Sequence, residues 1–364
     1  MPRNPMNLPS GALVEVEYQH MNALKIGILG TGFVQDFHMQ AYREIPNAEI
    51  VAVGSFTEEK AVAFAQKWQI PSAFAGENAI SQVCTLADVE AVDIGLPNDL
   101  HGPAIQLAAE NGKHVICEKP LGRTATEARA ALHAVEAGGV LHAYAENQVY
   151  FPLHAQVLGM LEHGVIGVPY MVRSREAHYG PHSGWFWDPA RSGGGVALDM
   201  GCHSVEVARK VFQNDTPVEA LMWADTLVHD TAAEDNCTIL VKYAHKQLGQ
   251  AENSWSAHGG LDLRTEIFGA GGAVFLDNTR ETGIRVFSTG GLDYSVEKGE
   301  SQKGWLYPVP NEFMAYGYYH ELKYFVECFK AGTLPYENFA DGVVVNAILD
   351  AAYKSVTTKQ WEPV

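Results

Sequence analysis

The sequence has few basic residues, few cysteines and no long apolar run. Lysine and arginine together number 25, against 43 aspartates and glutamates, so the formal net charge is −18. An acidic surface repels nucleic acid and anionic lipid, and the sequence contains no basic patch. No apolar run approaches the roughly 20 residues of a membrane-spanning helix. We therefore expect no nucleic-acid partner and no membrane association.

The five cysteines are scattered, odd in number and without a Cys-x-x-Cys pair. This pattern predicts reduced thiols rather than a disulfide framework or a zinc site. The first residues also lack the basic-then-apolar pattern of a signal peptide, so we expect a cytoplasmic protein. Residues 1–21 contain three prolines and little periodicity, which is typical of an N-terminal arm.

A dinucleotide-binding loop is indicated near the start of the chain. A short apolar run over residues 24–29 is followed by Gly-Thr-Gly and then by helical spacing over 33–45. Such glycines let the backbone turn tightly and approach a pyrophosphate at the helix N-terminus. The third glycine position is Gln35, and we expect this bulk to loosen the helix–strand packing. The loop candidates for cofactor binding are Gly30, Thr31, Gly32, Phe33 and Val34.

The end of the second predicted strand bears on the choice of cofactor. An NAD site usually has an acid there, about 20 residues beyond the glycines, for the ribose 2′-hydroxyl. Here Ser55 follows the strand 49–53, with Thr57 and Lys60 close behind. Without an acid to repel a 2′-phosphate, the sequence favours NADP(H) over NAD(H). Lys60 has an alternative interpretation as a solvated charge on the helix 58–68.

Strands and helices alternate over residues 24–148, which predicts a doubly wound parallel sheet. From residue 169 onward, short strands with glycine-rich links predict an antiparallel or mixed sheet. Two helices, expected over residues 312–330 and 340–354, close the chain. The fold class is therefore α/β, with a second α+β part. We expect a dinucleotide-binding domain over residues 22–147 and a second domain over 148–364.

The stretch CEKPLGR, residues 117–123, places a lysine at the end of a predicted strand. Open α/β sheets bind their ligands at the carboxyl ends of the strands. We expect a partly desolvated Lys119 there to have a depressed pKa and to exchange a proton near neutral pH, with Glu118 setting its charge. A surface turn is the alternative interpretation of an isolated Glu-Lys-Pro.

A second acid–base candidate is the pair Asp199 and His203, in a helix expected over residues 196–212. The spacing of four puts both side chains on one helix face, where a carboxylate raises the histidine pKa and orients the ring. The alternative is an ordinary surface pair. We expect the glycines 193–195 before the helix to let a ligand or the other domain come close.

Aromatic and polar residues gather in the loop 180–192 and around it, as in the wall of a sugar pocket. The candidate substrate contacts, by position and type, are Arg175, His178, Trp185, Trp187 and Tyr319. Each has an alternative interpretation as a core aromatic, a sheet-face salt bridge or a subunit contact. The ligand set His178, His182, Asp199 and His203 could be assembled around a metal. No HExxH-like spacing supports it, so we predict no metal.

Five segments occur in order: ILGTGFVQDFHMQAYREIP, LPNDLHGP, EKPLGRTATEA, AENQ and SGGGVALDMGCH. Together they resemble the glucose-fructose oxidoreductase / inositol 2-dehydrogenase (Gfo/Idh/MocA) family, over residues 24 to about 357. The resemblance implies an N-terminal Rossmann domain, an open, mostly antiparallel C-terminal sheet that carries homo-oligomerisation, and NAD(H) or NADP(H) as cofactor. It also implies site roles for Lys119, Asp199 and His203, and cofactor-side positions for Gly30, Gly32, Leu96, Asn98, His101, Glu118 and Gln148.

The implied reaction is hydride transfer between the nicotinamide and a secondary alcohol or ketone carbon of a sugar, inositol or glycoside. In the expected mechanism His203, oriented by Asp199, removes the hydroxyl proton and Lys119 stabilises the alkoxide. Which of Lys119 and His203 is the formal base stays open. One alternative is glycoside cleavage or transhydrogenation with a tightly bound cofactor and no net redox change. Another is a non-catalytic nucleotide-binding sensor.

Overall fold

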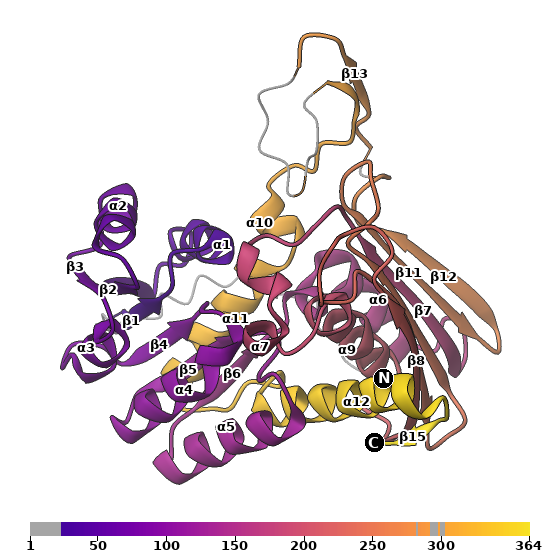
Figure 1. The fold of residues 1–364 in the computed structure, drawn as a ribbon, viewed down its shortest axis with the longest axis horizontal. Coiled ribbons are helices and arrows are strands. Elements are labelled where there is room, and N and C mark those ends of the chain that lie inside the picture. The colour runs from indigo at the N-terminus through magenta and orange to yellow at the C-terminus, as the bar shows by residue number, and fades with distance from the viewer. Residues whose placement is uncertain (1–22, 282, 292–297, 299–302) are drawn as a thin grey trace, which may run out of the picture.

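The first sheet consists of parallel strands in the order β3-β2-β1-β4-β5-β6 (Figure 1), which confirms the predicted doubly wound arrangement. The computed structural model describes residues 23–281, 283–291, 298 and 303–364, so the predicted arm over residues 1–21 lies outside the described residues. The strand order reverses between β1 and β4, where open α/β sheets bind their ligands. The elements are β1 (Leu24–Leu29), α1 (Phe33–Tyr42), β2 (Ala48–Ser55), α2 (Glu58–Trp68), β3 (Ser72–Ala75), α3 (Ala79–Thr85), β4 (Ala91–Ile94), η1 (Asn98–Leu100), α4 (His101–Glu110), β5 (His114–Glu118), α5 (Ala125–Gly138) and β6 (His142–Ala145).

Two of these elements, β3 and α3, lie in a stretch for which the sequence pattern indicates no element. β3 is a four-residue strand at the edge of the sheet, and none of its residues is fully buried. It therefore lacks the continuous apolar run that reveals the central strands, which are covered on both faces.

The second sheet has the order β12-β11-β7-β10-β9-β8-β15, and only β7 and β10 pair in parallel. This confirms the predicted, mostly antiparallel sheet. α9 and α12 pack on one face, while Trp223 and Phe275 are exposed. The elements before the last helices are η2 (Asn147–Tyr150), α6 (Pro152–Glu162), β7 (Pro169–Ala177), η3 (Gly184–Trp187), α7 (Pro189–Ser192), α8 (Val196–Asp199), α9 (Gly201–Val211), β8 (Pro217–Asp225), β9 (Asn236–Tyr243), β10 (Leu248–Ser254), β11 (Asp262–Gly269) and β12 (Gly272–Asp277).

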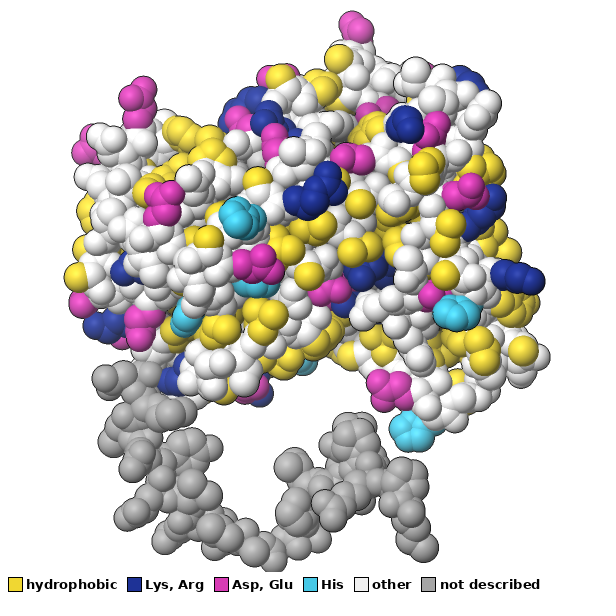
Figure 2. Space-filling view, turned by 90° about the horizontal axis from the view of Figure 1, so that it is seen from below, with side chains coloured by type: hydrophobic (Ala, Val, Ile, Leu, Met, Phe, Trp, Pro, Cys, Tyr) yellow, Lys and Arg dark blue, Asp and Glu magenta, His cyan; other side chains and the backbone are white. Residues whose placement is uncertain are grey.

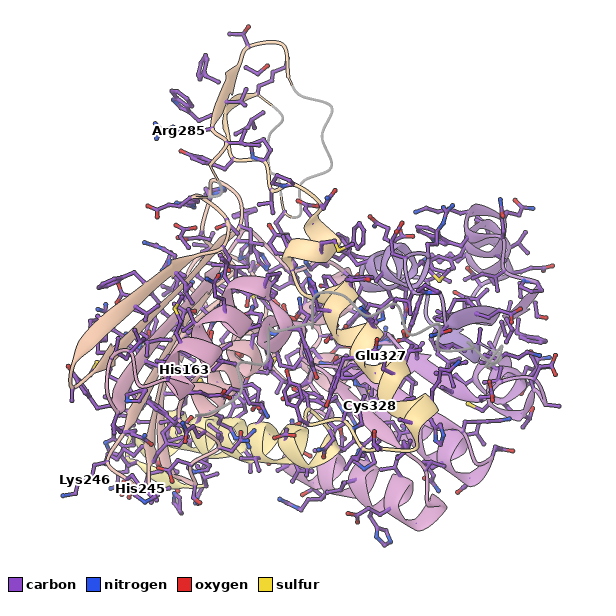
Figure 3. The ribbon with its side chains drawn as sticks, turned by 180° about the vertical axis from the view of Figure 1, so that it is seen from behind. His163, His245, Lys246, Arg285, Glu327 and Cys328 are labelled. Carbon is purple, nitrogen blue, oxygen red and sulfur yellow. The ribbon has the colours of Figure 1, made fainter. Side chains whose placement is uncertain are left out.

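The C-terminal helices return to the first sheet. α11 (Tyr318–Ala331) packs on α1, and α12 (Phe339–Thr358) packs on α5 as well as on β8. Seen from behind, α11, which carries Glu327 and Cys328, lies beside the helices of the first sheet (Figure 3). The chain ends with β15 (Glu362–Pro363), which joins the second sheet. These contacts cross the predicted division after residue 147, which stays a prediction.

Two helices that the sequence predicts as continuous are interrupted. The helix expected over residues 196–212 is divided into α8 and α9 at Met200. The one expected over 312–330 is divided into α10 (Glu312–Ala315) and α11 at Gly317, which has a φ of +79°. A side chain on Gly317 would overlap the carbonyl oxygen of Asn147. Apolar periodicity continues across both breaks, so periodicity alone does not reveal them.

A two-stranded hairpin, β13 (Val286–Ser288) and β14 (Gly304–Leu306), projects from the body beside Arg285 (Figures 1 and 3). On the face seen in Figure 2, basic side chains are scattered among acidic and apolar ones, without a continuous basic patch over the described residues. Within the part of the chain that the structure describes, no helix has both the length and the apolar character that crossing a bilayer takes.

Candidate functional site

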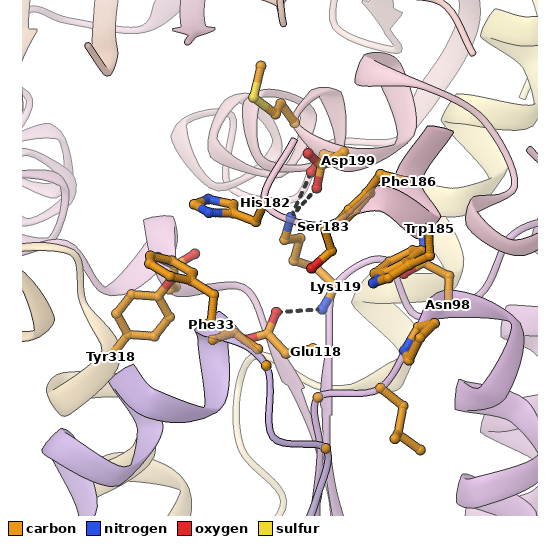
Figure 4. A pocket seen from close by; sticks show the side chains of 18 of the residues that line it. Phe33, Asn98, Glu118, Lys119, His182, Ser183, Trp185, Phe186, Asp199 and Tyr318 are labelled. Carbon is orange, nitrogen blue, oxygen red and sulfur yellow. Dashed lines mark hydrogen bonds and ion pairs between the residues drawn. The ribbon is translucent and has the colours of Figure 1, made fainter. Parts of the chain in front are cut away.

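A cleft of about 300 Å³ opens between the carboxyl ends of the first sheet and the segment from β7 to α9 (Figure 4). Most residues predicted for the site line this cleft. The fold brings them together from distant parts of the sequence. They are Gly30, Thr31, Gly32, Phe33, Val34, Ser55, Lys60, Leu96, Asn98, Glu118, Lys119, Gln148, His178, Trp185, Asp199 and His203.

The dinucleotide loop has the shape that a pyrophosphate requires. Gly30 has a φ of +108°, and a side chain there would overlap the carbonyl oxygen of Gly95. Among the described residues, a Cβ on Gly32 would meet no atom within 4 Å, so this glycine leaves open space in front of the helix. α1 begins directly after Gly32, and none of the described side chains caps its first amides. Free amides facing open space fit the phosphates of a dinucleotide.

Gln35, expected to loosen the packing of α1, is instead fully buried and tightly packed. Its Nε2 donates a hydrogen bond of 3.1 Å to Asp93 Oδ1. A Cβ on Gly95 would come within 2.5 Å of the same Nε2, so the glycine after β4 provides the space for the amide. The expectation was wrong because the residue facing Gln35 is itself a glycine.

The end of β2 presents hydroxyl groups to the cleft. Ser55 Oγ lies 3.0 Å from Thr31 Oγ1, and Thr57 Oγ1 accepts a hydrogen bond of 3.4 Å from the Lys60 amide. All four residues line the cleft, and the acids that open α2 do not. This edge therefore holds hydrogen-bond donors and a lysine, without a carboxylate among the described lining residues of β2 and α2.

Lys119 and Asp199 form an ion pair in the cleft (Figure 4). Lys119 Nζ donates to Asp199 Oδ1 at 2.9 Å and to the Asp199 carbonyl oxygen at 2.8 Å. Trp255 Nε1 donates to the other carboxylate oxygen at 3.2 Å. The expected orientation of His203 by Asp199 is therefore wrong, because Asp199 is directed to Lys119 and the break at Met200 separates the two residues into different helices.

The ion pair also corrects the expected charge of Lys119. Burial lowers the pKa of a lysine, but the Asp199 carboxylate outweighs this and raises the pKa of Lys119 above its usual value. Burial raises the pKa of Asp199, and Lys119 outweighs it in turn, so that this pKa falls to about 2. Lys119 is therefore a cation near neutral pH. It can donate hydrogen bonds to a reacting oxygen, but it cannot act as the base.

His203 is oriented by Glu146, which lies between β6 and η2. Its Nδ1 forms a hydrogen bond with Glu146 Oε1. Burial lowers the pKa of His203, but the Glu146 carboxylate outweighs burial and raises it above the usual value. A carboxylate only accepts hydrogen bonds, so Nδ1 carries a proton and Nε2 of the neutral ring is an acceptor. His203 can thus take up a proton at Nε2, with Glu146 stabilising the resulting imidazolium.

Cys202 lies next to this pair. Glu146, Cys202 and His203 each place one potential metal-ligating atom within 4.8 Å of the others. Two of these residues are joined directly by the hydrogen bond between His203 Nδ1 and Glu146 Oε1, so they can act as an acid–base pair.

The walls of the cleft come from both domains. The ring of His182 stacks on that of Phe33, with centroids 4.1 Å apart, and so connects the loop after β7 to α1. Trp185 stacks on Phe186 at 3.7 Å. The lining residues for which no role was predicted from the sequence include Glu176, Phe186, Tyr316 and Tyr318.

Four predicted contacts do not line the cleft: His101, Arg175, Trp187 and Tyr319. Arg175 lies on the face of β7 opposite to Glu176, where it pairs with Asp262 at 3.0 Å and with Glu252. Strand alternation separates it from the cleft side.

The other three have structural positions outside the cleft. The His101 ring lies 2.9 Å from the carbonyl oxygens of both Leu96 and Pro120, so it joins two loops beneath the cleft. Trp187 packs against Trp255, with centroids 5.1 Å apart. Tyr319 lies next to Lys323 on the half-exposed side of α11.

The glycines 193–195 allow the expected close approach of the other domain, because a Cβ on Gly193 would come within 2.6 Å of Arg123 Cβ. They also allow close contacts within the second half of the chain. Gly193 has a φ of +90°, a side chain on Gly194 would overlap the Tyr353 hydroxyl, and one on Gly195 would overlap the Glu234 carbonyl oxygen. The Glu234 carboxylate accepts hydrogen bonds from the amides of residues 195 and 197 at 2.9 and 3.1 Å, at the start of α8. These glycines therefore let the segment before α8 pass close to α12, while α8 itself packs on β9. The segment and β9 together position Asp199.

Two family models match the chain. "Oxidoreductase family, NAD-binding Rossmann fold" matches residues 24–145, and "GFO/IDH/MocA C-terminal domain" matches residues 154–275. Together they account for more than half of the chain. The chain belongs to the GFO/IDH/MocA oxidoreductase family.

Relatives that match over almost their whole length resemble most of the chain. Levoglucosan dehydrogenase of Pseudarthrobacter phenanthrenivorans is 28% identical, with 94% of this chain and 99% of the relative covered. Myo-inositol 2-dehydrogenase of Thermotoga maritima is 24% identical, with 93% and 97% covered. The solved structure of GenD2 from gentamicin A biosynthesis, in complex with NAD, has a TM-score of 0.89 at 24% identity, with 94% and 97% covered, which shows the shared fold.

Proposed function

We propose that the protein is an NAD(P)-dependent dehydrogenase or reductase acting on a secondary alcohol or ketone carbon of a sugar, inositol or glycoside. The observation that carries the proposal is the pairing of a cationic Lys119 with a Glu146-backed His203 in one cleft with a phosphate-binding loop. The full-length relatives named as dehydrogenases of levoglucosan and myo-inositol support the substrate class.

Each side chain has a distinct part in this mechanism. His203 takes the hydroxyl proton at Nε2, and Glu146 stabilises the charge that results. Lys119, held by Asp199, donates a hydrogen bond to the same oxygen as negative charge develops on it. The bound nicotinamide supplies the hydride acceptor for oxidation and the hydride donor for reduction. In the reducing direction His203 returns its proton to the oxygen.

The cofactor would be held by residues of the first domain. The amides after Gly32 suit the pyrophosphate. Ser55, Thr57 and Lys60 can donate to a 2′-phosphate, and this favours NADP(H). Solved relatives, including GenD2 and levoglucosan dehydrogenase, contain NAD or NADH, and this favours NAD(H) instead. The ratio of kcat/KM for the two nucleotides decides between them.

The aromatic and polar walls suit a carbohydrate. Trp185 and Phe186 offer flat apolar faces, and Glu176 and His178 offer polar atoms nearby. A glycoside-cleaving enzyme that oxidises its substrate only transiently would use the same groups. The distinction lies in the products, since only a dehydrogenase accumulates both a ketone and free reduced nucleotide.

The test is a screen of sugars, inositols and glycosides with NAD and with NADP. For at least one substrate we expect reduced nicotinamide and keto product to accumulate in a one-to-one ratio. Release of an aglycone without net nucleotide reduction would favour the cleaving enzyme. Heating the purified protein and analysing the released nucleotide shows whether the cofactor is retained between turnovers. Nucleotide binding without turnover of any substrate would favour a sensor.

A further inference from the structure

A chain of buried polar side chains lies behind Lys119 and takes no part in the mechanism above. Asp93 at the end of β4 lies 2.8 Å, through its Oδ2, from His38 Nδ1 on α1. The other ring nitrogen, His38 Nε2, lies 3.1 Å from Glu118 Oε1 at the end of β5. His38 and Asp93 are fully buried, whereas Glu118 lines the cleft.

The hydrogen-bond pattern fixes the charge of His38. Both ring nitrogens face carboxylate oxygens, and an ionised carboxylate can only accept. Asp93 is held as an acceptor by Tyr42, whose hydroxyl donates at 2.7 Å, and by Gln35 at 3.1 Å. A ring with a donor at each nitrogen is an imidazolium. Burial lowers the pKa of His38, but Asp93 and Glu118 outweigh burial and raise it well above its usual value.

Two further titratable groups, both from α11, face His38. One is Tyr318, whose ring centroid lies 5.7 Å from that of His38, and the other is Glu321. Glu321, from the first turn of α11, is fully buried and has a potential ligating atom within 4.8 Å of those of His38 and Glu118. Burial, and then the charge of Glu118, raise the pKa of Glu321 well above its usual value, which favours the neutral form of this carboxyl. The charge of His38 is therefore balanced by Asp93 and Glu118.

Glu118 links His38 to Lys119. While its Oε1 is held by His38, its Oε2 accepts a hydrogen bond of 3.1 Å from the backbone amide of Lys119 (Figure 4). Each carboxylate oxygen thus has one partner, so the carboxylate plane is fixed. The backbone from which Lys119 extends to Asp199 is fixed with it.

We propose that His38 is a positioning residue: as a permanent imidazolium between Asp93 and Glu118, it holds Glu118 in the orientation that places Lys119 for hydride transfer. The inference rests on the proposed function only for the step that Lys119 serves. The proposal gives a role to the histidine of the segment GFVQDFH. This residue is six positions beyond Gly32 and does not itself line the cleft.

A double-mutant cycle tests the coupling. We expect H38Q and E118Q each to lower kcat about 10- to 100-fold, since each removes a hydrogen bond between charged groups. The kcat of the double variant H38Q/E118Q should be no lower than that of E118Q alone, because His38 acts through Glu118. Y42F is the matched control: it removes another hydrogen bond to Asp93 but leaves the link from His38 to Glu118, so kcat should change less than about twofold.

A second readout needs no substrate. With ¹⁵N-labelled histidine rings, and H38Q to assign the signal, both His38 nitrogens should carry protons at pH 8, where an ordinary histidine is neutral. Three results would overturn the proposal. They are a neutral His38 ring at pH 8, a loss of kcat in H38Q/E118Q equal to the product of the two single losses, and a loss of kcat in Y42F as large as that in H38Q. A charged ring in a protein that oxidises no polyol would count against the proposed function instead.

Discussion

At the scale of single residues, the pairing of His203 with Glu146 determines the pH range of the proposed reaction. Oxidation requires a neutral His203, so activity should rise as the pH passes upward through the pKa of this residue. Because Glu146 raises that pKa above the usual value, the acidic limb of the pH profile should lie above about 6.5 in the wild type.

Replacing Glu146 by glutamine should move this limb to lower pH. Burial and the Lys119 charge, which lower the pKa of His203, are then opposed by Glu176 without the help of Glu146. We also expect turnover at pH 8 to fall about tenfold or more, as the ring becomes a weaker base. The measurement is kcat/KM between pH 5 and 10. The control D199N should lower turnover without moving the limb, because Asp199 bonds Lys119 rather than His203. An unmoved limb in E146Q would show that Glu146 does not set the pKa.

Sequence reasoning at this scale found the residue types but not all of their partners. Lys119 and His203 could be singled out because each stands in a local motif. Glu146 could not be joined to His203, because the two are 57 positions apart and meet only when η2 packs against α9. His101 was misassigned for the same reason, since its carbonyl partners are visible only in the folded chain.

At the scale of elements, the short helix α8 depends on the three glycines before it. Gly194 faces the Tyr353 hydroxyl of α12, so G194A should push the segment before α8 away from α12. We expect a loss of about 1–3 kcal/mol of stability, as for other overpacked sites, and a fall in kcat because Asp199 is displaced. Thermal unfolding and turnover measure the two effects.

The matched control for G194A is G159A, on the half-exposed part of α6, where an added Cβ meets no atom within 4 Å. Alanine is also the better helix former, so G159A should keep its activity and its stability or gain slightly. Equal melting temperatures for G194A and the wild type would contradict the close packing of Gly194 on Tyr353 of α12.

Regular elements with strong periodicity or buried runs, such as β1 and α9, could be predicted from the sequence. The breaks at Met200 and Gly317 could not, because they depend on contacts with distant segments rather than on local pattern. The glycine triplet and the close approach of the other domain, seen at Arg123, could be predicted. The contacts with Tyr353 and Glu234 could not, because these residues approach the triplet only in the fold.

At the scale of the whole molecule, the two sheets are joined by chain segments that return from the C-terminus. Residues of α11 share an apolar core with β1 and α1, including Phe325, Ile26 and Phe37. The sequence of an amphipathic helix shows which face is apolar but not which sheet that face covers. The predicted division after residue 147 therefore did not include the packing of α11 on the first sheet. Homo-oligomerisation through the second sheet stays a prediction.

The central claim is that this joined cleft performs hydride chemistry through Lys119, and Lys119→Ala tests it most directly. With a substrate found in the screen, the variant should bind nucleotide with a Kd within about threefold of wild type while kcat falls roughly two to four decades. The control is Lys67→Ala, at a half-exposed lysine whose Nζ pairs with Asp36 outside the cleft, and it should retain normal turnover. Near-normal turnover in Lys119→Ala would contradict the account.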